Sequence, residues 1–228
     1  MGSARVKLIS YTPEPEKVVA YAARICYSSE DPFELYDQLS EDQIARSIKT
    51  VKKRGHLSVL EHVSFTFVID GCSRVCTHQL VRHRLASYSQ RSQRYVNQEK
   101  EDFVIPPTIK ENADAVALFQ EHLQSSKRLY EQFLSLGIPK EDARFILPQS
   151  VKTTIVVTMN ARELLHFFAL RTCKRAQWEI QEVAMLMLNE VRPLAPILFE
   201  DAGPSCISMG QCPEGNEKCY EEVSKQWK

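Results

Sequence analysis

The side chains most able to do chemistry lie in an arginine-rich stretch, positions 82 to 95, which reads RHRLASYSQRSQRY. It contains four arginines, one histidine and three serines, and no Asp or Glu occurs anywhere between Gly71 and Gln98. Guanidinium groups bind phosphates and the edges of planar bases through paired hydrogen bonds, and hydroxyls fill the remaining acceptor sites. The stretch therefore predicts a site for anionic, planar ligands, although a solvated surface loop would show the same composition.

The order of residues within this stretch favours two ligands over one. Arg82, His83 and Arg84 are adjacent, so on a helix their side chains diverge by about 100 degrees each and cannot all reach one ligand. A phosphorylated substrate beside a phosphorylated cofactor would use all three. Tyr88 and Tyr95 could instead stack bases of an RNA. No wider basic surface supports that alternative, and the net charge is zero, so we expect no nucleic-acid partner.

Two other groups of residues could suggest a metal. His56 and His62 flank Glu61, but their spacing across a loop-to-strand junction is a poor ligand geometry. Three cysteines near the C-terminus lack an identifiable fourth ligand, so free thiols are expected. They are Cys206, Cys212 and Cys219. We predict no metal site.

The whole chain has 228 residues, with 29 basic and 29 acidic side chains. We expect one compact domain over residues 1–202, followed by an irregular, cysteine-bearing tail over 203–228. No apolar run approaches the roughly 20 residues that span a bilayer, and the first residues lack a secretion signal. The seven cysteines suit reduced thiols better than a disulfide framework. These features predict a cytoplasmic protein without membrane contact.

The first half of the chain must supply the elements that position the arginines. Alternating or periodic apolar residues predict a strand at 5–12, a helix at 15–28, a helix at 41–54 and a strand at 61–70. Ser40 and Gln43 form a capping-box pattern, and Gly55 is a typical C-terminal stop. A helix begins after a Ser73 cap. The segment 87–95 is expected to be a loop.

The second half is expected to alternate strands and long helices. Its patterns predict a strand at 102–109, a helix at 112–136, a strand at 152–160, a helix at 161–171 and a final helix at 175–191. Gly137 would end the first of these helices, and Asn160 would cap the second. The predicted fold class is α+β, with a central mixed or antiparallel sheet and long helices.

Several blocks of this sequence resemble the flavin-dependent thymidylate synthases. The stretch RHRLASYSQRS matches the family signature of R-H-R, seven further residues and Ser. GHLSVLEHVSFTF precedes it, and EDARFILP and NARELLHFFALRTCKRAQWEIQ follow it, in the order in which the family has them. The resemblance spans roughly residues 5 to 200.

This resemblance implies a reaction, a set of cofactors and an assembly. The reaction is the methylation of dUMP to dTMP, with 5,10-methylenetetrahydrofolate as the carbon donor and NADPH as the reductant through FAD. The assembly is a homotetramer with its sites at subunit interfaces. No protein nucleophile is needed in the family's chemistry, since the cofactors carry the difficult steps.

The resemblance also implies roles for individual residues. Arg171 would be catalytic, because its positive charge polarises the uracil and stabilises negative charge that develops on the ring. Residues implied to bind dUMP are Gln79, Arg82, Gln90, Arg91, Ser92, Gln93, Arg94, Arg144 and Arg171. Residues implied to bind FAD are Ser58, Arg82, His83, Arg84, Gln90, Asn160, Arg162 and His166.

Three positions depart from the family pattern. Ser89-Gln90 stands where many members have Asn-Glu, His166 replaces an asparagine found in some members, and Arg175 replaces a histidine found in others. A role that needs negative charge at position 90 cannot be filled by an amide. The alternative function is therefore a flavin- or nucleotide-binding protein with altered catalysis.

Overall fold

The computed structural model describes residues 4–99 and 102–227, and the chain divides into two compact units. The first unit comprises the described residues of 1–5, 69–82 and 88–156. The second unit comprises the described residues of 6–68, 83–87 and 157–228. The domain boundary that the sequence suggests at residue 202 stays a prediction.

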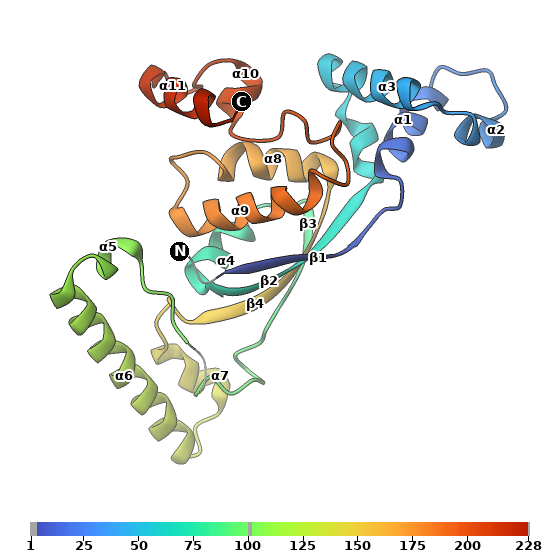
Figure 1. The fold of residues 1–228 in the computed structure, drawn as a ribbon. Helices are drawn as coiled ribbons and strands as arrows, with labels where there is room; N and C mark the ends of the chain where they lie inside the picture. The colour runs from blue at the N-terminus through green and yellow to red at the C-terminus, as the bar shows by residue number, and fades with distance from the viewer. Residues whose placement is uncertain (1–3, 100–101, 228) are drawn as a thin grey trace. The chain divides into compact units, whose positions relative to one another are not determined.

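A four-stranded antiparallel sheet runs through the fold in the order β1-β2-β4-β3 (Figure 1). Its strands are β1 (Arg5–Tyr11), β2 (Ser64–Ser73), β3 (Ala86–Gln90) and β4 (Lys152–Asn160). The register of β2 against β4 is fixed by two side-chain bonds: the hydroxyls of Thr66 and Thr158 lie 2.9 Å apart, and the Thr154 hydroxyl donates to Asp70 over 2.7 Å. The α+β class with an antiparallel sheet is confirmed.

Alternating burial along β2 explains why the sequence predicts this strand correctly. Phe65, Phe67 and Ile69 are buried, whereas Ser64 is exposed, which is the period-two pattern of a strand with one buried face. In the second unit Phe65 packs edge-on against Phe199 with ring centroids 5.5 Å apart. Aromatic pairs of this kind contribute to the core beyond their buried area.

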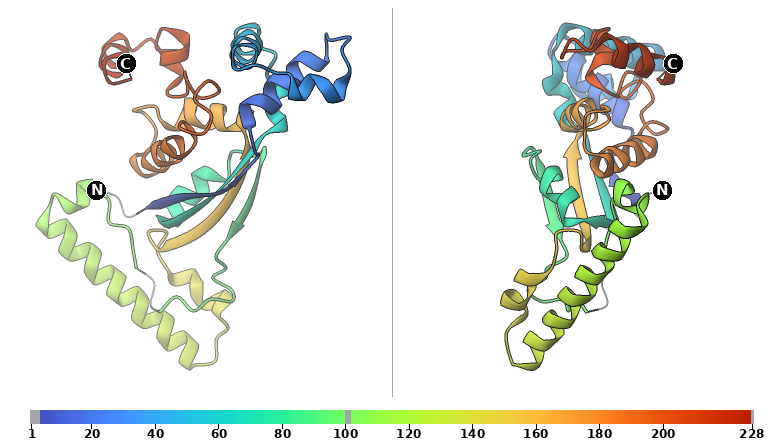
Figure 2. Two further views of the ribbon diagram at one scale, coloured as in Figure 1. Left: turned by 45° about the vertical axis from the view of Figure 1, so that its right-hand side comes forward. Right: turned by 90° about the vertical axis from the view of Figure 1, so that its left-hand side faces the viewer.

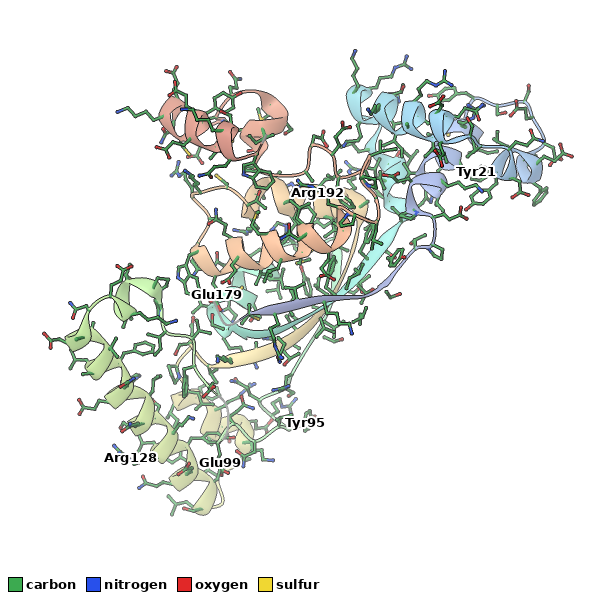
Figure 3. The ribbon with its side chains drawn as sticks, viewed as in Figure 1. Tyr21, Tyr95, Glu99, Arg128, Glu179 and Arg192 are labelled. Atoms are coloured by element: carbon green, nitrogen blue, oxygen red, sulfur yellow. The ribbon has the colours of Figure 1, made fainter. Side chains whose placement is uncertain are left out.

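The N-terminal helices of the second unit are α1 (Pro15–Ile25), α2 (Pro32–Asp37) and α3 (Glu41–Arg54), followed by the 3-10 helix η1 (Leu57–His62). The predicted capping box is confirmed, since Ser40 N donates to the Gln43 side chain and Gln43 N donates to the Ser40 hydroxyl. Gly55 ends α3 at φ 72°, a conformation that favours glycine. α1 and α3 lie side by side (Figure 2). Tyr21 of α1 (Figure 3) donates to the carbonyl of Pro32, where α2 begins.

The C-terminal helices of the second unit are α8 (Ala161–Arg171), α9 (Trp178–Val191), α10 (Ser205–Met209) and α11 (Glu217–Gln226). Figure 1 shows α8 and α9 packed against each other. The tail is not irregular as expected, since it contains α10 and α11. Residues outside the tail contact it: Lys174 pairs with Glu222 over 2.8 Å, and Arg192, labelled in Figure 3, lies over the Trp227 ring.

The helices of the first unit are α4 (Arg74–Leu80), α5 (Pro107–Lys110), α6 (Ala113–Ser135) and α7 (Lys140–Ala143), with the 3-10 helix η2 (Arg144–Ile146). Ser73 caps α4 as predicted, because its side chain accepts from Cys76 N. The strand predicted at 102–109 is wrong. Phe103 forms one isolated bridge with Val151, and Pro106 and Pro107, which have no N–H for a sheet, begin α5 instead.

The predicted loop at 87–95 is also partly wrong, because β3 occupies its first half. This strand has polar residues and lies at the edge of the sheet, so its pairing with β4 and not its own pattern makes it a strand. All seven cysteines are free thiols. Within residues 4–99 and 102–227, no helix is both long and apolar enough to cross a bilayer.

Candidate functional site

In the first unit, Gln90 is held by two threonine hydroxyls. Its Nε2 donates to Thr77 Oγ1 over 3.0 Å and to Thr153 Oγ1 over 3.4 Å. The Thr77 hydroxyl in turn donates to the Arg74 carbonyl over 3.1 Å, so its own proton is already used. A carboxylate at position 90 would meet the oxygen of Thr77 without a donor between them. The amide at this position therefore matches its surroundings.

Arg74 and Arg144 place two positive charges near each other in the first unit. Burial, followed by the charge of Arg144, lowers the pKa of the Arg74 guanidinium below its usual range. Arg74 Nη2 donates to the Arg91 carbonyl over 3.2 Å, but its buried Nε has no hydrogen-bond partner among the described residues. Two like charges with a vacant donor favour the binding of an anion between them. Arg74 belongs to the acid-free window, and this is the signal by which the sequence could have added it to the site.

Glu141 orders two of the predicted dUMP residues. Arg94 Nε donates to the Glu141 carboxylate over 2.7 Å, which raises the pKa of Arg94, and Arg144 Nε donates to the Glu141 carbonyl over 3.0 Å. Arg94 N also donates to the Ser92 hydroxyl over 3.1 Å. Both partners of the Arg94–Glu141 pair are about half exposed, so the pair orients Arg94 more than it stabilises the fold.

The remaining dUMP residues of the first unit lie on α4, after it, or after β3. Gln79 is in α4, and Arg82 N donates to the Gln79 carbonyl over 3.3 Å just beyond the end of the helix. Gln93 makes a 3.5 Å contact with Gln98. The first unit thus brings Gln90, Arg91 and Arg144 into one network around Arg74, while Arg82 is exposed on the turn after α4.

In the second unit, a buried histidine links an arginine to a carboxylate. His83 is only 4% exposed, and Arg171 Nε donates to its Nε2 over 3.1 Å. Because Nε2 accepts this hydrogen bond, the proton of the neutral ring is on Nδ1. His83 Nδ1 lies 3.3 Å from Glu163 Oε1. The order of contacts is therefore Glu163, His83, Arg171.

Burial sets the charges of this chain of contacts. Burial, followed by the positive charge of Arg171 and the proximity of His166, lowers the pKa of His83 to about 4. Burial also raises the pKa of the Glu163 carboxyl, against the opposing effect of His166. His83 is therefore neutral near pH 7. A neutral partner leaves the charge of Arg171 available to another group.

Helix α8 positions this chain of contacts. Asn160 begins the helix as predicted, since its side chain accepts from Glu163 N over 2.8 Å. The ring of His166 lies edge-on to His83 with centroids 5.6 Å apart, and Phe167 lies 5.0 Å from the same ring. Spacings of three to four residues place such side chains on one face of a helix.

The other residues predicted to bind FAD are more exposed. Arg162 Nη1 donates to Glu61 over 2.6 Å, and Ser58 is exposed on η1. Arg84 is exposed directly after His83. The second unit therefore brings His83, His166 and Arg171 together. Glu163 was not predicted, because a buried carboxylate in an apolar helix has no sequence signature.

Comparison with known proteins supplies an independent set of observations. A family model described as "Thymidylate synthase complementing protein" matches residues 7–197. The chain is 50% identical over 235 residues to the flavin-dependent thymidylate synthase of Pyrococcus horikoshii, covering 98% of this chain and 97% of that protein. It is 48% identical over 217 residues to the flavin-dependent thymidylate synthase of Geobacter sulfurreducens, covering 94% and 93%.

A solved structure is similar as well. It is the crystal structure of the UMP/dUMP methylase PolB from Streptomyces cacaoi bound with 5-Br dUMP. The two chains superpose with a TM-score of 0.75 at 25% sequence identity, over 88% of this chain and 94% of that one.

Proposed function

The chain belongs to the family of flavin-dependent thymidylate synthases, and we propose which ligands and residues carry its reaction. It is a thymidylate synthase of the methyltransferase type that forms dTMP. We propose dUMP as the methyl acceptor, 5,10-methylenetetrahydrofolate as the carbon donor and NADPH as the reductant, with FAD as the bound flavin. A related methylase whose structure contains a dUMP analogue supports the choice of acceptor.

The observation that carries the proposed roles is the hydrogen bond from Arg171 to a buried, neutral His83. It fixes the orientation of the guanidinium without neutralising it. Among the described residues Arg171 forms no ion pair with a carboxylate. Its charge can therefore stabilise the negative charge that develops on the pyrimidine ring, which is the electrostatic role proposed for it.

The remaining dUMP groups are assigned to the first unit. The phosphate is a dianion, and the network of Arg74, Arg91 and Arg144 holds positive charge and a vacant donor suited to it. Gln79, Arg82 and the polar segment 90–94 would orient the ribose and base. Arg74 is added to the residues that the sequence suggested.

The residues present fit a flavin dinucleotide. Exposed guanidiniums of Arg84 and Arg162 and the hydroxyl of Ser58 are donors for a pyrophosphate, and the exposed edge of His166 can contact a flat ring. When bound, FAD supplies the hydride chemistry that no amino-acid side chain provides. His83 has a different part, because its buried ring orients Arg171.

Exposed apolar side chains beside the site arginines support the proposed homotetramer. Leu85, Tyr95 and Phe145 are 67%, 72% and 82% exposed, and each directly follows a proposed site arginine in the sequence. Contiguous patches of large exposed apolar groups mark interfaces between subunits. Sites at subunit interfaces would bury them. A cytoplasmic location stays a prediction.

The test of the proposed function uses the purified full chain. We expect the protein to carry flavin and to form dTMP when dUMP, methylenetetrahydrofolate and NADPH are all present. Omission of any one of them should abolish product. Bound flavin without dTMP would instead favour the alternative, a flavin- and nucleotide-binding protein with altered catalysis.

A further inference from the structure

A pocket of about 510 Å³ in the second unit lies apart from all the residues assigned above. It is lined by residues from the end of α1, the segment that follows it, α3 and His56 beyond α3. Ala23 and Val51 are its buried apolar lining residues. Its volume is in the range of pockets that bind small molecules.

The polar lining of the pocket is strongly positive. Arg24, Arg46 and Arg54 contribute three guanidiniums, and Glu30 is the single lining carboxylate. Glu30 accepts a hydrogen bond from the Ser28 hydroxyl over 3.3 Å, and no ion pair joins it to an arginine among the described residues. The pocket thus has an excess of positive charge that is not neutralised from within.

One of these guanidiniums has an unused donor. Arg24 Nε is buried and has no hydrogen-bond partner in the described part of the chain. A buried donor without a partner is destabilising unless a ligand or water satisfies it. Basic residues in the last turns of α1 and α3 also interact favourably with the helix dipoles. That interaction explains their charge, but it does not satisfy a buried Nε that lines a pocket.

The neutral lining groups favour a phosphorylated nucleoside. Ser29, Ser47 and Thr50 offer hydroxyls beside the arginines, which suits the several oxygens of a phosphate. The ring of Tyr27 is 82% exposed at the same pocket and is available to stack on a planar base. A phosphomonoester next to a purine would use both sets of groups.

We propose that this pocket binds the adenosine 2′-phosphate end of NADPH. The identity of the nucleotide rests on the proposed function, whereas the binding of a phosphomonoester by these arginines does not. The pocket then distinguishes NADPH from NADH, since only NADPH carries the 2′-phosphate.

The test is a direct binding measurement on the full-length, flavin-loaded protein. Adenosine 2′,5′-bisphosphate and 5′-AMP are titrated calorimetrically into the wild type, Arg46→Gln, Arg54→Gln and the control Lys53→Gln. Lys53 neighbours Arg54 and is exposed but does not line the pocket. We expect the bisphosphate to bind about tenfold tighter than AMP, and each arginine variant to lose about tenfold in bisphosphate affinity, since each variant removes a charge-assisted hydrogen bond to the 2′-phosphate. Lys53→Gln should leave the affinity unchanged.

Three results would overturn the proposal. The first is equal affinity of the wild type for the bisphosphate and for AMP. The second is an equal loss of bisphosphate affinity in Lys53→Gln and Arg54→Gln. The third is a loss of affinity for a polyglutamylated folate in the arginine variants while their bisphosphate binding is unchanged. The last would assign the pocket to the carboxylates of the folate tail. A wild type that binds bisphosphate as expected but forms no dTMP would refute the proposed function and leave the pocket intact. Thermal unfolding of each variant verifies that it is folded.

Discussion

Arg171 donates a hydrogen bond from Nε to Nε2 of His83 over 3.1 Å, although the two residues are 88 positions apart in the sequence. The bond requires His83 to be neutral and to carry its proton on Nδ1, which lies toward Glu163. The pKa of about 4 that burial gives His83 meets this requirement at neutral pH. The buried pair of His83 and Glu163 thus orients Arg171, the arginine proposed to act on the pyrimidine.

Arg171→Ala should lower kcat by about 10²- to 10³-fold, the range found when a group that stabilises transition-state charge is removed. Flavin should stay bound, because Arg171 is not among the proposed flavin residues. The measurement is dTMP formation together with the flavin absorbance of the purified variant. Near-normal turnover would show that Arg171 does not have the proposed role.

Glu163 is predicted to position Arg171 through His83 without contacting any ligand. Glu163→Leu removes the carboxylate that lies 3.3 Å from His83 Nδ1, so we expect kcat to fall by about tenfold to a hundredfold while KM for dUMP changes little. Glu163→Gln keeps an acceptor oxygen and should retain most of the activity. Equal losses in both variants, or a loss confined to KM, would contradict a positioning role.

Stability should fall on acidification because of His83. Its folded pKa of about 4 lies below the usual 6.5, so between these values the unfolded chain binds more protons than the folded protein. The contribution of the neutral, buried His83 to the free energy of unfolding is fully present above about pH 6.5. It is lost as the pH falls toward 4, and the loss is at most about 3 kcal/mol. Glu163, whose pKa is raised, titrates in the opposite sense and offsets part of this loss.

Guanidinium unfolding of His83→Gln between pH 7.5 and 4.5 measures this contribution. The free energy of unfolding of the variant should depend less steeply on pH than that of the wild type. His122→Gln, at an exposed position of α6, is the control and should show the slope of the wild type. A His83 variant with the same slope as the control would exclude the buried histidine as the cause.

Arg144 should contribute to dUMP binding but little to the stability of the fold. Arg144→Gln removes a positive charge from the neighbourhood of Arg74, so the stability of the ligand-free protein should change by no more than about 0.5 kcal/mol. Its affinity for dUMP should fall about tenfold, because the phosphate loses a charged partner. Arg128→Gln, at an exposed position of α6 (Figure 3), serves as the matched control. Unchanged dUMP affinity in Arg144→Gln would remove Arg144 from the site.

The parts of the fold that the sequence predicts are those fixed by local interactions. The capping box at Ser40, the αL glycine at position 55 and the Asn160 cap each involve residues within a few positions of one another. β3 and the helices of the tail were missed. Their sequences are short and polar, and they make contacts with partners distant in the sequence, as with Lys174 and Glu222.

The candidate site divides in the same way. The arginine-rich stretch is visible in the sequence because charge composition is a local property. The partners of these residues are not visible: Glu163 acts by being buried, and Arg74 acts through a vacant Nε and a nearby Arg144. Burial and the meeting of like charges arise only from tertiary packing, so they appear only in the folded chain.

The most direct test of the account is a single turnover without oxygen. The flavin of the purified protein is reduced with NADPH, and dUMP and methylenetetrahydrofolate are then added while flavin absorbance and dTMP are followed together. The account predicts that the absorbance of the oxidised flavin returns in step with dTMP, with one dTMP for each flavin reoxidised. Formation of dTMP without flavin reoxidation, or reoxidation without dTMP, would contradict it.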